Sequence, residues 1–142
     1  MAYKVFLSHS MGEADRDLVA QVAGVIQGHG IECYIASRDY QLGHQLPEKI
    51  GGSLRSSDSL VALLTQGGSH AEWVNQEIGF ARGIGKLTIP VLEVGVEPSG
   101  FLVGLEYLRL DRGTAAHGLE ALGQYLTGLQ PKKATTELII GA

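Results

Sequence analysis

The chain has 142 residues, 44% of them hydrophobic and 18% charged, which is typical of one globular domain with a single core. Its formal net charge of −4 disfavours nucleic acid as a partner, because basic surfaces neutralise phosphate backbones. One cysteine, Cys33, excludes an intrachain disulfide and favours a reducing compartment. No apolar run approaches the roughly 20 residues that span a bilayer, the first residues do not resemble a signal peptide, and the histidines have no metal-ligand spacing. We therefore expect a cytoplasmic protein without a metal and without a membrane or nucleic-acid partner.

Short apolar runs and helical periodicities alternate along the chain. In order, the expected elements are a strand at 3–8, a helix at 14–27, a strand at 31–36, a helix at 45–57, a strand at 59–65, a helix at 69–84, strands at 87–93 and 107–111, and a helix at 118–129. The run 59–65 has no polar alternation, as expected for a strand buried on both faces of a parallel sheet. Pro90 predicts that the strand at 87–93 is irregular or lies near an edge.

The alternation of strands and helices predicts the fold class. Residues 37–44 and 95–105 are expected to be loops, and 131–142 a C-terminal tail behind a domain that spans 1–130. Five alternations indicate a doubly wound α/β sheet with right-handed crossovers and helices on both faces. In such sheets, ligands bind beyond the carboxyl ends of the strands. Those ends are expected at 8–11, 37–43, 65–69 and from 93 onward.

One carboxylate interrupts the apolar pattern of the helix predicted at 69–84. Ser69 followed by Glu72 forms a capping box, which indicates the start of this helix. At 100° per residue, its apolar side chains fall within one arc of roughly 160°. That arc consists of Trp73, Val74, Ile78, Phe80, Ala81 and Ile84. Glu77 falls near the middle of the arc, where a carboxylate must be paired, protonated or facing a cleft.

Two interpretations of Glu77 are open. In the first, an arginine such as Arg38 or Arg55 neutralises the carboxylate in an ion pair. In the second, Glu77 faces a pocket, because functional sites are where sequence rules break locally. Trp73 lies one turn earlier on the same face. Its ring would then stack on a flat ligand while the acid acts on the attached sugar, whereas the alternative is an ordinary core tryptophan.

The first half of the chain resembles a TIR domain. YKVFLSHS at 3–10 is similar to the first box of that family, and Asp15 with the helix after it fits the usual continuation. SRDYQLGHQL at 37–46 resembles the second box and its loop, although Leu42 stands where the family usually has proline.

The resemblance continues into the second half of the chain. WVNQE at 73–77 fits the W-x-x-x-E pattern of TIR domains that consume NAD+, and GKLTIPVLEV at 85–94 matches the strand that follows. The resemblance extends over residues 3–111 and implies a flavodoxin-like, five-stranded parallel sheet. It also implies cleavage of the nicotinamide–ribose bond of NAD+, which is then a substrate and not a cofactor, to give ADP-ribose or a cyclic ADP-ribose isomer.

The resemblance also implies roles for particular residues. Glu77 would be the catalytic glutamate. The residues that would line the substrate pocket are Phe6, Ser8, His9, Ser10, Arg38, Asp39, Gln41, Gly43 and Trp73.

The chain is similar to bacterial stand-alone TIR proteins of antiphage defence (Thoeris-like), which make a nucleotide as an immune signal. This similarity implies self-association through TIR–TIR contacts, with the loop 37–44 as the natural contact, and a downstream effector that senses the nucleotide. The apolar residues 138–140 either dock on a neighbouring molecule or pack on their own domain.

Three other functions are compatible with parts of the sequence. A non-catalytic TIR adaptor would use the same fold for homotypic contacts, and the position of Glu77 argues against it. A receiver domain needs a cluster of acids after the first strand and an aspartate at the end of the third, where this chain has Thr65. A phosphate-binding loop is disfavoured because GFARGIGK at 79–86 is one residue too long and Leu87 replaces the required Ser or Thr.

Overall fold

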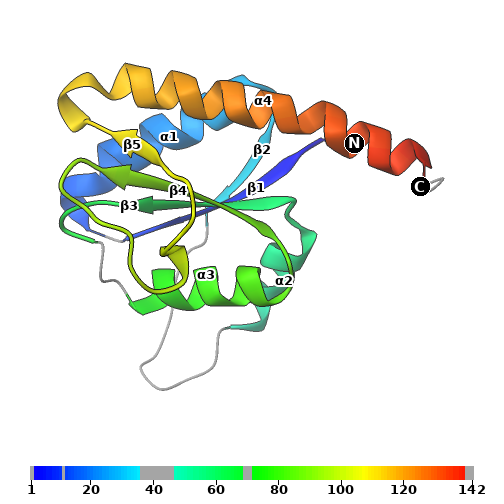
Figure 1. Cartoon of the computed structure of the whole chain (residues 1–142), viewed down its shortest axis with the longest axis horizontal. Helices are drawn as coiled ribbons and strands as arrows, with labels where there is room; N and C mark the ends of the chain where they lie inside the picture. The colour runs from blue at the N-terminus through cyan, green and yellow to red at the C-terminus, as the bar shows by residue number, and fades with distance from the viewer. Residues whose placement is uncertain (1, 11, 36–46, 69–71, 140–142) are drawn as a thin grey trace.

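The computed structural model describes residues 2–10, 12–35, 47–68 and 72–139, and beyond Gln130 it describes the side chain of Lys133 alone. Within these residues the chain forms a five-stranded sheet between two layers of helices (Figure 1). The strands are β1 (Lys4–His9), β2 (Glu32–Ile35), β3 (Ser59–Leu64), β4 (Leu87–Glu93) and β5 (Leu108–Leu110). The helices are α1 (Arg16–Gly28), α2 (Glu48–Ser56), α3 (Glu72–Gly83) and α4 (Ala115–Ile139), with 3-10 turns at Glu13–Asp15 (η1), Gly100–Leu102 (η2) and Arg112–Thr114 (η3).

All neighbouring strands are parallel, in the order β2-β1-β3-β4-β5. Figure 1 shows α1 and α4 on one face of the sheet and α2 and α3 on the other. The strand order reverses at β1, which has β2 on one side and β3 on the other, so the switch point of the sheet lies between β1 and β3. This arrangement confirms the predicted flavodoxin-like, doubly wound α/β fold.

The sheet separates two apolar cores. Along β1, Val5 and Leu7 contribute to the core beneath α1 and α4, while Phe6 contributes to the core beneath α2 and α3. All six residues of β3 are buried. The apolar run without alternation is thus a central strand covered on both faces, as predicted.

Pro90 lies in the half of β4 that has only one neighbouring strand. β3 pairs with β4 from Leu87 onward, whereas β5 joins only from Val91. Proline has no backbone N–H and is tolerated where the sheet has an open side. This position agrees with the expectation that Pro90 lies near an edge.

The last helix is the largest correction to the predicted elements. The sequence predicts a helix that ends at 129 and a tail from 131, but α4 continues to Ile139. Pro131 has no N–H, so the helix lacks one backbone hydrogen bond there and is locally less stable. Two contacts of Lys133 stabilise this part of the helix, because its ammonium lies 2.8 Å from Asp58 Oδ2 and 2.9 Å from the carbonyl oxygen of Ala2. At Lys133, therefore, the helix packs on its own domain beside the N-terminus.

Two other helix boundaries also differ from the sequence prediction. The helix expected at 45–57 begins at Glu48, and Pro47 is its N-cap residue. α3 begins at Glu72, and Ser69 of the expected capping box lies outside the described residues. In the described part of the chain, no helix is both long and apolar enough to cross a membrane.

Candidate functional site

Glu77 is buried in the apolar face of α3. Its exposed fraction is 0%, and the neighbouring Val74, Ile78 and Ala81 on the same face are also buried. The prediction that this carboxylate lies inside the apolar arc is therefore confirmed. A carboxylate in such a place requires hydrogen-bond donors, since burial removes its water.

Ser8 is one of those donors. Its Oγ donates a hydrogen bond to Glu77 Oε1 over 2.6 Å, a short distance that is usual for a hydroxyl bound to a carboxylate. Ser8 is fully buried near the carboxyl end of β1. Because the strand order reverses between β1 and β3, the contact lies at the switch point, where doubly wound sheets bind ligands.

Arg55 does not neutralise Glu77. Its guanidinium carbon lies 5.1 Å from the centre of the Phe80 ring, so that α2 and α3 are joined by a cation–π contact. The ion pairs among the described residues do not join Arg55 to Glu77. The other arginine considered from the sequence, Arg38, lies outside the described residues.

The remaining predicted pocket residues occupy different surroundings. Phe6 is fully buried with its ring centre 5.4 Å from that of Tyr34, and Trp73 is partly buried against the same core. His9 alternates to the opposite face of β1. Its Nδ1 lies 2.6 Å from the carbonyl oxygen of Ser10, so that this nitrogen carries a proton. Arg38, Asp39, Gln41 and Gly43 lie outside the described residues.

A second buried polar group lies at the same end of the sheet. Asp15, in η1, is 5% exposed. Its Oδ2 accepts hydrogen bonds from Ser10 Oγ at 3.0 Å and from Thr65 Oγ1 at 2.6 Å. Ser10 follows β1 and Thr65 follows β3, so one carboxylate oxygen joins the ends of two neighbouring strands.

Arg112, in η3, binds the other oxygen of Asp15 and extends the group to β4. Its Nη2 lies 2.8 Å from Asp15 Oδ1, its Nε lies 2.9 Å from Glu93 Oε2, and its Nη1 donates to the carbonyl of Ala14 at 3.0 Å. The Gln66 backbone N–H donates to Glu93 Oε1 at 3.0 Å. The guanidinium thus lies between two carboxylates, and in the described part of the chain no cluster of His, Cys, Asp or Glu is arranged to hold a metal ion.

We call Ser10, Asp15, Thr65, Glu93 and Arg112 the strand-end clamp. Burial raises the pKa of Asp15, but the hydrogen bonds of its clamp partners outweigh this effect and leave the pKa below its usual value. The Arg112 guanidinium lowers the pKa of Glu93 by more than burial raises it. The hydrogen bonds that Arg112 donates to these two carboxylates raise its pKa. All three side chains are therefore charged at neutral pH.

Gly68 lies against the strand-end clamp, because a Cβ at this position would overlap the side chain of Ser10. We expect Gly68→Ala to lower the free energy of unfolding by about 1–3 kcal/mol, as overpacking of a filled site usually does. Gly67→Ala is the matched control, since its Cβ would meet nothing within 4 Å. Urea unfolding of both variants measures the effect, and equal stabilities would show that Ser10 moves aside at no cost.

The family of the chain follows from a comparison of its sequence with known domains. The sequence profile of the TIR domain matches residues 5–125. The chain belongs to the TIR domain family. No curated protein sequence matches it.

Solved structures with the same fold as this TIR domain include proteins of several kinds. A CMP N-glycosidase from Clostridium botulinum, BcmB, is 18% identical with a TM-score of 0.62, over 86% of this chain and 98% of that one. A metazoan TIR-STING receptor from C. gigas in complex with 2',3'-cGAMP is 18% identical with a TM-score of 0.60, over 84% and 39%. The TIR domains of the activated Roq1 resistosome are 18% identical with a TM-score of 0.52, over 64% and 57%, so the chain matches little more than half of that protein. At 18% identity these likenesses show the fold alone.

The sequence placed Ser10 in the substrate pocket and Asp15 in the family pattern, but it did not predict Glu93, Arg112 or the contacts that join the strand-end clamp. Arg112 and Asp15 are 97 positions apart, and Arg112 and Glu93 are 19 apart, so no local spacing joins them. One feature of the sequence could have indicated these contacts. Glu93 ends an apolar strand at the carboxyl edge of the sheet, where a charged side chain needs a partner.

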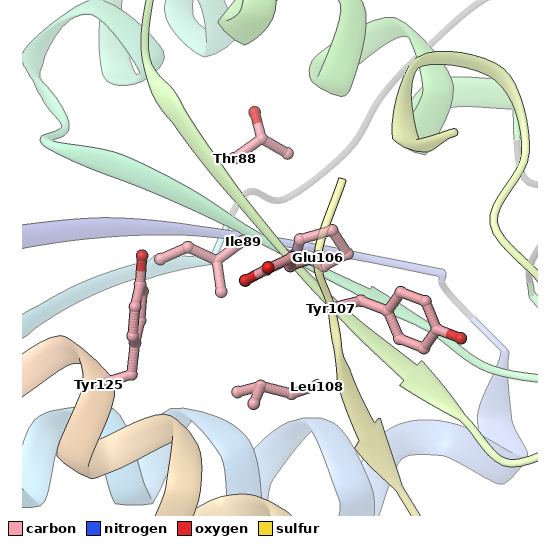
Figure 2. Close-up of a pocket in the computed structure, with 7 residues that line it drawn as sticks. Thr88, Ile89, Glu106, Tyr107, Leu108 and Tyr125 are labelled. Atoms are coloured by element: carbon pink, nitrogen blue, oxygen red, sulfur yellow. The ribbon is translucent and has the colours of Figure 1, made fainter. Parts of the chain in front are cut away.

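Two cavities of the TIR domain lie away from Glu77. One, of about 180 Å³, lies beside β4, the start of β5 and α4. Figure 2 shows Ile89, Leu108 and Tyr125 around it, with the ring of Tyr107 directed away from them. The other, of about 240 Å³, lies at the amino-terminal ends of β1 and β2 and includes Cys33. Burial raises the pKa of that thiol to about 11, which keeps it protonated and unreactive.

Proposed function

We propose that this TIR domain cleaves the nicotinamide–ribose bond of NAD+, with Glu77 as the catalytic carboxylate, and releases ADP-ribose or a cyclic ADP-ribose isomer. The observation that carries the proposal is the buried Glu77, bound by Ser8 at the switch point of the sheet. A buried carboxylate lowers the stability of the fold, because an apolar residue of similar volume would pack here without desolvating a charge. We therefore infer that Glu77 has a functional role.

Cleavage of the nicotinamide–ribose bond requires a negatively charged group near the ribose, which Glu77 would provide. When the bond between C1′ and the nicotinamide nitrogen breaks, the electron pair leaves with nicotinamide, which becomes neutral. The ribose carbon then acquires oxocarbenium character, which a nearby carboxylate stabilises, as in glycosidases. Attack by water with loss of a proton gives ADP-ribose, whereas attack by a nucleophile on the adenosine part of the same molecule gives a cyclic isomer.

Ser8 and Trp73 would support this reaction in different ways. The hydrogen bond from Ser8 fixes the orientation of the Glu77 carboxylate, which matters because stabilisation of the transition state depends on groups that are already in place. Trp73 lies one turn before Glu77 on α3 and is partly buried. Its indole would stack on a flat ring while Glu77 acts on the ribose.

One structural neighbour supports the class of bond that is broken. BcmB is named a CMP N-glycosidase, and CMP and NAD+ both carry a ribose bound through nitrogen to a flat ring. Both compounds are therefore substrates to be compared in the test, because the ring that leaves distinguishes them. We further propose that the released nucleotide is an immune signal in antiphage defence. Self-associated TIR domains would make it in the cytoplasm, and a downstream effector that senses the nucleotide would respond to it.

The test is an incubation of the purified chain with NAD+ and, in parallel, with CMP. Low and high protein concentrations, with and without a crowding agent, allow for an enzyme that requires assembly. Chromatography with mass spectrometry follows nicotinamide, ADP-ribose, cyclic isomers and cytosine. We expect nicotinamide to be released from NAD+ with a matching nucleotide product. Release of cytosine without release of nicotinamide would identify CMP in place of NAD+ as the substrate, while the bond broken would still join a ribose to a ring nitrogen. No turnover under any condition would favour the non-catalytic adaptor.

A further inference from the structure

The ends of β1 and β3 are joined by a single carboxylate beside the candidate catalytic pair. We propose that Asp15 is a positioning residue, which holds these strand ends so that Ser8 keeps Glu77 oriented toward the ribose of the substrate. This inference rests on the proposed NAD+ cleavage. It assigns Asp15 a role in the rate of that reaction without contact with the substrate.

Asp15 reaches Ser8 through one short piece of backbone. Ser10 follows Ser8 by two positions, and its Oγ donates to Asp15 Oδ2 at 3.0 Å. Thr65 Oγ1 donates to the same oxygen at 2.6 Å. Since Ser8 pairs with Ala62 across the switch point, both strands that flank the site are fixed just beyond that pair.

Arg112 prevents Asp15 from rotating. Asp15 Oδ2 is occupied by the two hydroxyls, and Oδ1 is bound by Arg112 Nη2 at 2.8 Å. The guanidinium is itself fixed by Glu93 at the end of β4 and by the carbonyl of Ala14. The carboxylate of Asp15 is therefore held in one orientation, and in that orientation it binds the Ser10 side chain directly after β1.

Two observations indicate that this position is defined tightly. Ser8 and Glu77 are both fully buried and their oxygens lie 2.6 Å apart, so that no water is at hand to replace this hydrogen bond if β1 shifts. Gly68, after β3, leaves no room between the chain and the Ser10 side chain. A misplacement of about 1 Å costs roughly 10²-fold in enzymes whose catalytic groups must be aligned.

The experiment compares Asp15→Asn with Asp17→Asn, a control at an exposed aspartate two positions later. Asparagine retains one oxygen for the hydroxyls, but its amide nitrogen faces the Arg112 donors. We expect kcat for NAD+ cleavage to fall about 10- to 100-fold in Asp15→Asn, with KM within about twofold and with no change in Asp17→Asn. If Asp15→Asn does not fold, Thr65→Val replaces it, because it removes the 2.6 Å hydrogen bond to Asp15 Oδ2 at a residue outside the predicted substrate pocket, with an expected loss in kcat of several-fold.

Hydrogen exchange separates positioning from general instability and from failure of the proposed reaction. We expect faster exchange in peptides from β1 and β3 of Asp15→Asn, with α1 and α4 unchanged. Unchanged kcat, or a loss explained by the unfolded fraction alone, would overturn the inference. If the wild-type chain does not cleave NAD+, the proposed function fails. Exchange confined to β1 and β3 would still support the positioning of the Ser8–Glu77 pair, and uniform exchange would refute it.

Discussion

Glu77→Gln is expected to lower kcat for NAD+ cleavage by about 10²–10³-fold, the usual effect of losing one group that stabilises charge in a transition state. Glutamine has nearly the same shape and its carbonyl oxygen still accepts the hydrogen bond from Ser8. It carries no negative charge, so it cannot balance the positive charge that develops on the ribose. Initial rates of nicotinamide release measure the effect, and circular dichroism verifies the fold.

Two further variants make this result specific. Glu72→Gln changes an exposed glutamate at the start of the same helix, and we expect it to retain the wild-type rate. Ser8→Ala removes one hydrogen bond to the Glu77 carboxylate and leaves the charge, so its loss should be smaller, about 10-fold. A Glu77→Gln variant with the wild-type rate would remove Glu77 from the chemistry and leave the ion-pair interpretation.

The elements that the sequence predicted well are those that depend on local apolar periodicity. The run 59–65 lies within one residue of β3, because a strand buried on both faces cannot tolerate polar alternation. The helical arc placed Glu77 among Val74, Ile78 and Ala81, and these side chains are buried together. The information is local in both cases, a continuous apolar run for β3 and a period of 3.6 residues for α3, and no contact between distant segments is needed.

The features that the sequence did not predict depend on contacts between distant segments. Asp15 is the last residue of η1, Glu93 the last of β4 and Arg112 the first of η3, and their ion pairs form only when the fold brings those ends together. The length of α4 has the same origin. The sequence predicts a helix that ends at 129, whereas α4 continues to Ile139, and Lys133 in the added part binds Asp58 and the carbonyl oxygen of Ala2, which lie 75 and 131 positions away.

The ion pairs of the strand-end clamp should make the free energy of unfolding depend on pH. The free energy of unfolding at pH 7 should fall by about 2–3 kcal/mol in Arg112→Met, less than for a fully buried ion pair because the arginine side chain is 40% exposed. The substitution leaves two buried carboxylates, Asp15 and Glu93, without their cation. Urea unfolding at pH 7, 5, 4 and 3 measures the difference. Arg16→Met, which removes the same charge from an exposed pair with Glu13, is the control and should change stability by less than about 0.5 kcal/mol.

The sign of the pH dependence follows from the lowered pKa values of Asp15 and Glu93. Carboxylates whose pKa is lower in the folded state stabilise the fold above their unfolded values, about 3.9 and 4.3, and lose this contribution as the pH falls through the folded pKa. In Arg112→Met, Glu93 loses the largest cause of its lowered pKa, whereas Asp15 loses the contribution of Arg112 but keeps the hydrogen bonds from Thr65 and Ser10, so that protonation destabilises the variant less than the wild type. The gap between wild type and variant should therefore be widest at pH 7 and narrow below about pH 4. A gap of constant size down to pH 3 would mean that Arg112 stabilises the domain by packing and not by its charge.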